Sequence, residues 1–322
     1  MKNNSKEHRN RDIWIGCLSA IAGEMLFGFS FLFTKNAAAE ASAFALLGWR
    51  FLLAWSTMTL LAAVRLVRFR LDAQLIRRLL PIAILCPCIY FIGETIGISH
   101  TTVTESGVFI ACVPVVSVLF STWILKNKPT RFQATGIVIT LIGVVITVVA
   151  VGTSSSLSVI GYLFLTIAVV SYSIYSSLVE KNAEHSGIEL TYVMLSAGAI
   201  VFVILALAEA AAEGSVQALL TLPFRSGDFR IAILYQGIGC SILAFFLMNL
   251  ALSRIGVNRT SSFVGVSTIT AIAAGTLLMK EAFTAGQFAG AVIIILGIYI
   301  ANAGIKPGER RRNTADRNGS GA

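Results

Sequence analysis

The sequence predicts an all-α integral membrane protein, with ten transmembrane helices arranged as two inverted five-helix repeats and both termini in the cytoplasm. Three observations support this prediction: the composition, ten long apolar stretches, and an internal repeat. Of the 322 residues, 56% are hydrophobic and only 13% are charged, whereas soluble domains carry about 25% charged residues. The chain is therefore predicted to lie in a membrane and to contain no soluble domain.

Ten apolar stretches have the length that a helix needs to cross a bilayer, which is about 20 residues. They lie at residues 13–34, 42–64, 79–98, 104–125, 132–151, 157–179, 190–208, 231–252, 260–279 and 285–304. The first follows basic residues and precedes Ala41-Ser42-Ala43, as in a cleavable signal peptide. Its 22 residues exceed the usual signal-peptide core of about 7–15, so we predict a membrane helix.

An internal repeat divides the chain into two halves. The stretch from Glu105 to Ile146 recurs 154 positions later with ten identities, including the frame Lys-x(3)-Thr-x(2)-Gln-x(2)-Gly-x(6)-Gly. Because five is an odd number of crossings, the two copies must have opposite orientations. We predict one repeat at 12–151 and a second at 157–305. A cytoplasmic tail at 1–11 and a basic cytoplasmic tail at 306–322 are both expected to be disordered.

Basic residues are distributed very unequally between the two sides of the predicted membrane. With the N-terminus in the cytoplasm, the inner segments hold 20 Lys and Arg residues and the outer segments hold 4. Because basic loops stay in the cytoplasm, this bias predicts that both termini lie inside. It also explains the net charge of +9 without a nucleic-acid partner, and leaves weak contact with anionic lipid as a secondary interpretation.

Three ionisable residues, Glu24, Arg50 and Glu94, lie inside predicted membrane helices. Each costs at least ~2.5–3.5 kcal/mol to insert, so each is a functional candidate. The helical rise places all three between the bilayer midplane and its outer third. We predict a polar centre in which Arg50 binds an anionic group, while a glutamate binds a substrate ammonium or carries a coupling proton. The alternative is an Arg–Glu pair that fixes helix packing.

The second half offers polar rather than charged candidates for substrate binding or coupling. Tyr172 and Ser176 share one face of a predicted helix, and Tyr235, Gln236 and Asn249 lie on another. Aromatic and amide groups suit amphipathic metabolites, although they also form ordinary hydrogen bonds between membrane helices.

Prolines interrupt the third and fourth predicted helices. Pro87 and Pro114 are expected to break them, and broken helices expose backbone groups that can line a transport site. The alternative is a static kink whose backbone groups are satisfied by neighbouring helices.

Motifs spread over the chain are those of a known family. They are Phe27-Gly28-x-Ser30-Phe31-x-x-x-Lys35, Arg50-Phe51, Tyr90-Phe91-x-x-Glu94-x-x-Gly97 with Thr102 and Pro114, and Asn302. In these the chain resembles the EamA-like branch of the drug/metabolite transporter superfamily. Two positions depart from the pattern: Asn127 replaces a common Glu that Glu281 keeps in the second copy, and Thr268 replaces the proline expected there.

The resemblance and the inverted repeat together predict a secondary-active transporter that works by alternating access. Small metabolites, amino acids or amphipathic drugs are the expected cargo, and export across the cytoplasmic membrane is the favoured direction. A proton or substrate gradient would supply the energy, because no Walker motif is present. A flippase for a lipid-linked substrate, a channel and an intramembrane transferase are the alternatives.

No cofactor, metal or catalytic residue is predicted. A transferase would need a nucleophile with a base, or metal ligands, but His8, His100 and His185 are scattered along the chain. The cysteines show no ligand spacing. The expected partners are a small-molecule substrate and the lipid bilayer, with no nucleic acid. Because Gly-x(3)-Gly motifs permit close helix contact, the protein is expected to be a monomer or a homodimer.

Overall fold

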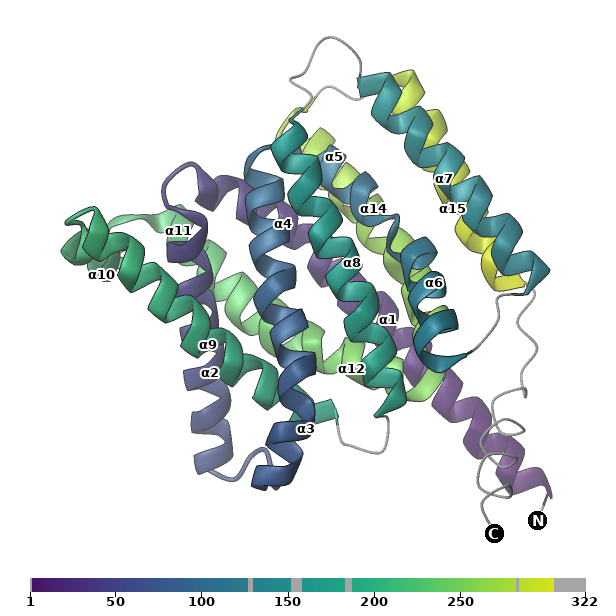
Figure 1. Cartoon of the computed structure of the whole chain (residues 1–322), viewed down its shortest axis with the longest axis horizontal. Coiled ribbons are helices and arrows are strands. Elements are labelled where there is room, and N and C mark those ends of the chain that lie inside the picture. Colours follow the sequence, from purple (N-terminus) through teal and green to yellow (C-terminus); the bar gives the residue numbers. More distant parts are fainter. Residues whose placement is uncertain (1, 127–129, 152–157, 183–186, 282–283, 304–322) are drawn as a thin grey trace.

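The computed structural model describes residues 2–126, 130–151, 158–182, 187–281 and 284–303, and these form helices and short connections without strands (Figure 1). In chain order the first half contains α1 (Lys2–Ala38), α2 (Ala43–Ala63), α3 (Ala73–Ala83), η1 (Ile84–Ile89), α4 (Tyr90–Ser99), α5 (Val103–Ile110), α6 (Val113–Leu125) and α7 (Arg131–Val151). The second half contains α8 (Val159–Lys181), α9 (Gly187–Ala212), α10 (Val216–Arg225), α11 (Gly227–Leu234), η3 (Tyr235–Ala244), α12 (Phe245–Ile255), α13 (Val257–Thr260), η4 (Ser261–Phe263), α14 (Val264–Ala273), η5 (Ala274–Leu278) and α15 (Ala285–Ala303).

Seven helical segments of the described chain are long and apolar enough to cross a membrane. They are Asp12–Ala38, Ala43–Ala63, Ala73–Ser99, Val159–Lys181, Gly187–Ala212, Gly227–Ile255 and Val257–Leu278. Three shorter apolar helices are Val113–Leu125, Ala134–Gly143 and Ala285–Gly297. The protein is therefore an all-helical, multi-pass membrane protein. Each of these segments overlaps one predicted stretch, and the number of ten crossings stays a prediction.

The two halves of the chain interlock. Helix α1 packs against α12 and α14 of the second half, and α8 packs against α4 and α6 of the first half. In the repeat, α1 corresponds to α8, α12 to α4 and α14 to α6, so the contacts of α1 and the contacts of α8 are equivalent. We call α1, α12 and α14 the α1 bundle, and α4, α6 and α8 the α8 bundle. In addition, α2 packs against α9, and α7 packs against α15.

Helices α7 and α15 form a separate pair at the edge of the molecule (Figure 1). A β-carbon on Gly143 would lie 2.8 Å from the Gly290 carbonyl oxygen, and one on Gly297 would lie 2.8 Å from the Gly136 carbonyl oxygen. The two contacts are equivalent under the 154-residue repeat, and they show that the helices run antiparallel. Glycine is required because the backbones touch.

A Gly143→Ala substitution is expected to weaken this helix pair, because its new methyl group meets backbone atoms that have little freedom to move. We expect a loss of about 1–3 kcal/mol in unfolding free energy, measured by denaturant titration in mixed micelles. Leu141→Ala is the matched control, since Leu141 is 42% exposed on the same helix. Equal stability of the Gly143 variant and the control would contradict a close backbone contact.

The repeated frame marks the end of one helix and the start of the next. Lys126 and Lys280 both adopt the left-handed conformation, with φ of 57° and 54°, which ends a helix. In the second copy, Thr284 N–H donates to Gln287 Oε1 (2.8 Å) and Gln287 N–H donates to Thr284 Oγ1 (3.2 Å). This reciprocal pair is a capping box. The frame thus has a structural explanation.

Several predicted helices contain breaks. The chain leaves helical geometry at Cys86 (φ −136°, ψ 116°), directly before Pro87. The predicted helix 104–125 is divided into α5 and α6, and Pro114 is the second residue of α6, where its missing N–H costs nothing. The repeat counterpart of Pro114, Thr268, lies within the continuous helix α14. The two halves therefore differ at this position.

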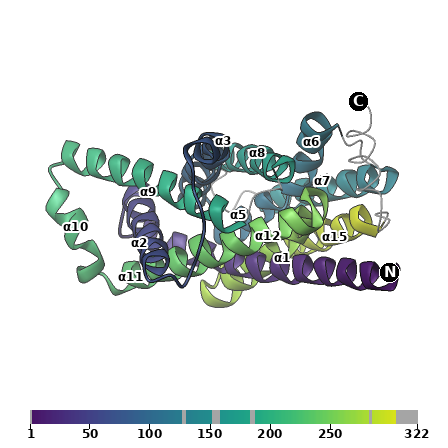
Figure 2. The same ribbon diagram turned by 90° about the horizontal axis from the view of Figure 1, so that it is seen from below.

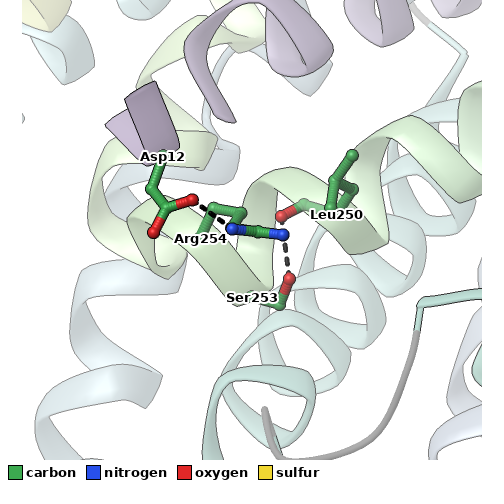
Figure 3. A network of polar contacts seen from close by, with 4 residues as sticks. All are labelled: Asp12, Leu250, Ser253 and Arg254. Atoms are coloured by element: carbon green, nitrogen blue, oxygen red, sulfur yellow. Dashed lines mark hydrogen bonds and ion pairs between the residues drawn. The ribbon is translucent and has the colours of Figure 1, made fainter. Parts of the chain in front are cut away.

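The N-terminal prediction needs correction. Helix α1 begins at Lys2, whereas the sequence predicted a disordered tail at 1–11. Lys, Glu and Arg favour helices, and extending an existing helix avoids the cost of nucleation. Asp12, where the membrane-crossing part of α1 begins, pairs with Arg254 of α12 (Figure 3). Beside this pair, the Ser253 hydroxyl donates to the Leu250 carbonyl oxygen. The predicted tail at 306–322 and Asn127 lie outside the described residues.

The longest connection between predicted membrane helices, residues 209–230, contains the helix α10. It connects α9 to α11 at the edge of the molecule farthest from α7 and α15 (Figure 2). The Trp49 indole N–H donates to the Leu219 carbonyl oxygen (3.0 Å), which ties α10 to α2. Phe224 and Leu220 are 81% and 53% exposed, so one face of α10 remains free to contact lipid.

Candidate functional site

A small cavity lies between the two bundles, and we call it the central cavity. Its lining consists of Glu24, Phe27, Phe31, Cys86, Tyr90, Ile110, Val113, Tyr172, Tyr175, Phe245, Met248, Val264 and Ser267. The space open to the centre of a water-sized sphere is about 20 Å³, and about 10–15 Å³ is enough for one water. The cavity must therefore expand before it admits a metabolite.

Glu24 is the acidic residue of the central cavity. It lies on α1 with 3% of its surface exposed. Ser267 of α14 provides a hydrogen-bonding hydroxyl beside its carboxyl group, and Tyr172 of α8 is close enough to interact with it electrostatically. Because a carboxyl group inside a membrane is costly, its position at a cavity favours a ligand or a proton as its partner.

Tyrosine rings form one wall of the central cavity. The rings of Tyr90 and Tyr172, and those of Tyr172 and Tyr175, have centroids 5.5 Å apart. Aromatic ring faces attract cations, and an ammonium group can also pair with the Glu24 carboxylate. The wall and the carboxylate together provide a chemical environment for an amine that also carries an apolar group.

Arg50 lies behind this cavity and does not line it. Its side chain is fully buried on α2. Its Nε–H donates to Ser241 Oγ (2.8 Å) and its Nη1–H donates to Gln236 Oε1 (3.1 Å), both on η3. The guanidinium also lies over the Phe91 ring, 4.1 Å from its centroid. Within the described chain, Nη2 has no hydrogen-bond partner.

Glu94 also lies outside the lining of the central cavity. It is buried on α4, and the hydroxyl of Tyr90 donates to its Oε1 (2.6 Å). Arg50 attracts it electrostatically, but no ion pair joins the two described side chains. Glu94 therefore reaches the cavity through Tyr90. Of the three predicted ionisable residues, the structure places only Glu24 at the central cavity.

The remaining predicted residues occupy different environments. Ser176 is buried, and its hydroxyl donates to the Tyr172 carbonyl oxygen of its own helix (2.8 Å). Tyr235 is half-buried on the far side of α1, where its hydroxyl donates to the Leu26 carbonyl oxygen (3.0 Å) and its ring stacks on Phe33. Gln236 contacts Arg50 and also donates from Nε2 to Thr34 Oγ1 (3.0 Å).

Asn249 separates the central cavity from a second one. The hydroxyl of Tyr175 donates to Asn249 Oδ1 (2.5 Å), and Asn249 Nδ2 donates to Thr191 Oγ1 (3.0 Å). The second cavity, of about 10 Å³, is lined by Leu79, Ile82, Val179, Asn182, Gly187, Leu190, Asn249 and Ser253. Tyr175 lines the first cavity and Asn249 the second, so their hydrogen bond lies between the two spaces.

Several residues that line the central cavity carry no signal in the sequence. Ser267, Phe245 and Met248 lie on apolar helices with no charged residue within five positions of them, so nothing distinguishes them from packing residues. Tyr90 belongs to the motif that contains Glu94, and its four-residue spacing from Glu94 could have indicated a contact on one helix face. Among the described residues, no group of His, Cys, Asp or Glu could hold a metal.

These features define a class of protein: a multi-pass helical membrane protein with a small acidic and aromatic cavity between two interlocked bundles. Residues 14–149 and residues 159–303 match the EamA-like transporter family. The chain belongs to this family and is a membrane transporter. Its predicted resemblance to the drug/metabolite transporter superfamily is confirmed.

Individual relatives agree with this assignment. The chain is 31% identical over 296 residues to YcxC, an uncharacterized transporter of Bacillus subtilis, which covers 91% of this chain and 95% of that protein. It is 22% identical over 182 residues to a probable amino-acid metabolite efflux pump of Salmonella typhimurium, which covers 55% of this chain and 60% of that protein. A crystal structure with 18% identity has a TM-score of 0.63 and covers 89% of this chain and 98% of that one. This last similarity concerns the fold alone.

Proposed function

We propose that this protein is a secondary-active transporter that moves small amine-containing metabolites, with amino acids as the leading class, across the cytoplasmic membrane by alternating access. The observation behind this proposal is the position of Glu24, a buried carboxyl group that lines a small cavity between two bundles related by the repeat. Substrate sites of inverted-repeat transporters lie at such an interface.

The proposed moving bodies are the α1 and α8 bundles. Each bundle combines helices from both halves of the chain, so a rotation of one sequence half against the other would break the main helix contacts. Separation of the bundles at one end would open the central cavity to one side of the membrane. Closure there and separation at the other end would complete the cycle.

Export is the proposed direction, supported by the relative that is named a probable amino-acid metabolite efflux pump. The proposed topology has ten crossings in two inverted repeats, with both termini in the cytoplasm. The antiparallel contact between α7 and α15 supports the inversion. We propose that the protein acts as a monomer or homodimer, without a cofactor or a nucleic-acid partner, and that a proton gradient drives it through Glu24.

Counterflow in proteoliposomes tests the proposed function. Vesicles containing the purified protein are loaded with one unlabelled amino acid or aromatic amine, and the labelled compound is added outside. We expect transient accumulation of the label for at least one compound, because a carrier exchanges substrate through a saturable site. Protein-free vesicles provide the control. Rapid equilibration without accumulation would indicate a pore, and the absence of counterflow with all twenty amino acids and the amines would overturn the proposed cargo.

A further inference from the structure

The turn between α4 and α5 receives a lysine from another helix. The Lys35 ammonium group, in the last turn of α1, donates to the carbonyl oxygens of Ile98 (3.2 Å), Ser99 (3.2 Å) and Thr101 (2.5 Å). The Ile98 and Ser99 carbonyl groups lie at the C-terminal end of α4, where the helix dipole is negative, and the Thr101 carbonyl group lies in the turn that follows. Lys35 therefore holds the end of α4 through charge-assisted hydrogen bonds.

A glutamate from the opposite half holds the other side of the same turn. The Glu281 carboxylate accepts hydrogen bonds from the backbone N–H groups of Val103 (2.8 Å) and Thr104 (3.0 Å) and from the Thr104 hydroxyl (2.7 Å). These donors lie at the N-terminus of α5, where the dipole favours an anion. Lys35 and Glu281 also attract each other electrostatically.

The backbone around Gly275 is shaped to admit this carboxylate. A β-carbon on Gly275 would collide with Glu281 Oε2 and with the Thr104 hydroxyl. The Glu281 N–H also donates to the Gly275 carbonyl oxygen (3.0 Å). A glycine is thus needed where Glu281 reaches across to α5, which is an observation independent of the hydrogen bonds.

These contacts connect the two bundles at one end of the central cavity. Lys35 belongs to α1, and Glu281 follows α14 and η5. The turn that they hold joins α4 to α5, which precedes α6. We propose that Lys35 and Glu281 form an outer lock, which positions the α4–α5 turn and keeps the central cavity closed to the outer side of the membrane. This inference rests on the proposed function and on its topology, in which this turn faces outward.

The opposite end of the molecule provides matched control positions. There the Glu180 carboxylate of α8 accepts from the N–H of Val257 (2.6 Å), and the Ser121 hydroxyl donates to Asn258 Oδ1 (3.1 Å). Val257 is the repeat counterpart of Val103, so both bonds connect the bundles at the inner end. Replacing Glu180 therefore removes a similar carboxylate without touching the outer lock.

Accessibility of Cys86 tests the outer lock, because this thiol is buried and lines the central cavity. The other cysteines, Cys17, Cys88, Cys112 and Cys240, are replaced by alanine. A membrane-impermeant thiol reagent is applied to intact spheroplasts and, separately, to inside-out vesicles. Glu281→Gln and Lys35→Met are expected to raise the rate of Cys86 labelling from the spheroplast side by about tenfold or more, because they remove hydrogen bonds to charged groups.

Two further variants distinguish the lock from general loosening of the protein. Gly275→Ala retains both charges and is expected to raise labelling from the outer side, because its methyl group displaces the Glu281 carboxylate. Glu180→Gln is expected to leave outer labelling at the level of the parent chain. Unchanged labelling in the Lys35, Glu281 and Gly275 variants, or an equal increase from both sides, would overturn the lock. This readout needs no substrate, so failed counterflow would refute the proposed function separately.

Discussion

A Glu24→Gln variant is expected to lose about 10- to 100-fold of its transport rate while it keeps its fold. The substitution retains the size and a hydrogen-bonding oxygen for Ser267 but removes the negative charge from the central cavity. A hydrogen bond to a charged group contributes about 1.5–3 kcal/mol, which corresponds to this loss of rate. Initial rates of efflux from cells, at matched levels of membrane-inserted protein, measure the effect.

The matched control for this prediction is Tyr235→Phe. Tyr235 is also a predicted site residue, but its hydroxyl contacts the Leu26 backbone outside the cavity, so transport should change less than twofold. Counterflow then separates two roles of Glu24. If Glu24→Gln retains counterflow but no longer responds to a proton gradient, the carboxylate carries the coupling proton. Loss of both activities indicates substrate binding, and wild-type rates in both assays would exclude Glu24 from the mechanism.

Replacing Arg50 is expected to cause the largest loss of stability. Arg50→Lys keeps the charge but cannot reproduce the planar group that contacts Ser241, Gln236 and the Phe91 ring. We expect the unfolding free energy to fall by about 2–3 kcal/mol, together with a lower thermal midpoint in detergent. Arg50→Ala should be worse, because the buried Glu94 then loses its nearby positive charge.

A surface arginine provides the comparison for Arg50. Arg254 pairs with Asp12, but both side chains are partly exposed, at 42% and 46%. Exposed ion pairs contribute about 0–1 kcal/mol, so Arg254→Ala should change the thermal midpoint little. Equal destabilisation by the Arg50 and Arg254 variants would show that burial and the contacts with η3 do not determine the importance of Arg50.

Much of the fold could be predicted because membrane helices are long, apolar and locally encoded. The apolar stretches overlap the observed helices, and the repeated Lys-x(3)-Thr-x(2)-Gln frame is explained by the helix-ending Lys280 and the capping pair of Thr284 and Gln287. The breaks were harder to place. Cys86 leaves helical geometry directly before a proline, whereas the interruption between α5 and α6, at residues 111–112, ends two residues before Pro114.

The candidate site could be predicted only in part, because its residues meet through contacts between distant helices. Spacing along one helix could place Glu24, Arg50 and Glu94 at similar depths, but it could not assign their rotation about the helix axes. That rotation directs Arg50 toward η3 and Glu24 toward the cavity. Apart from the Thr104 hydroxyl, the hydrogen-bond partners of Lys35 and Glu281 are backbone groups, which no sequence motif reveals.

The pairing of α7 with α15 also bears on how the chain is assembled during synthesis. Gly143 and Gly290 are in contact although about 150 residues separate them in sequence. At about 5–20 residues per second, α7 enters the membrane about 8–30 s before its partner exists. During that interval its glycine face must lie against lipid or the insertion machinery. This contact is thus among the last long-range contacts to form, and a chain stopped before α15 would leave α7 without its antiparallel partner.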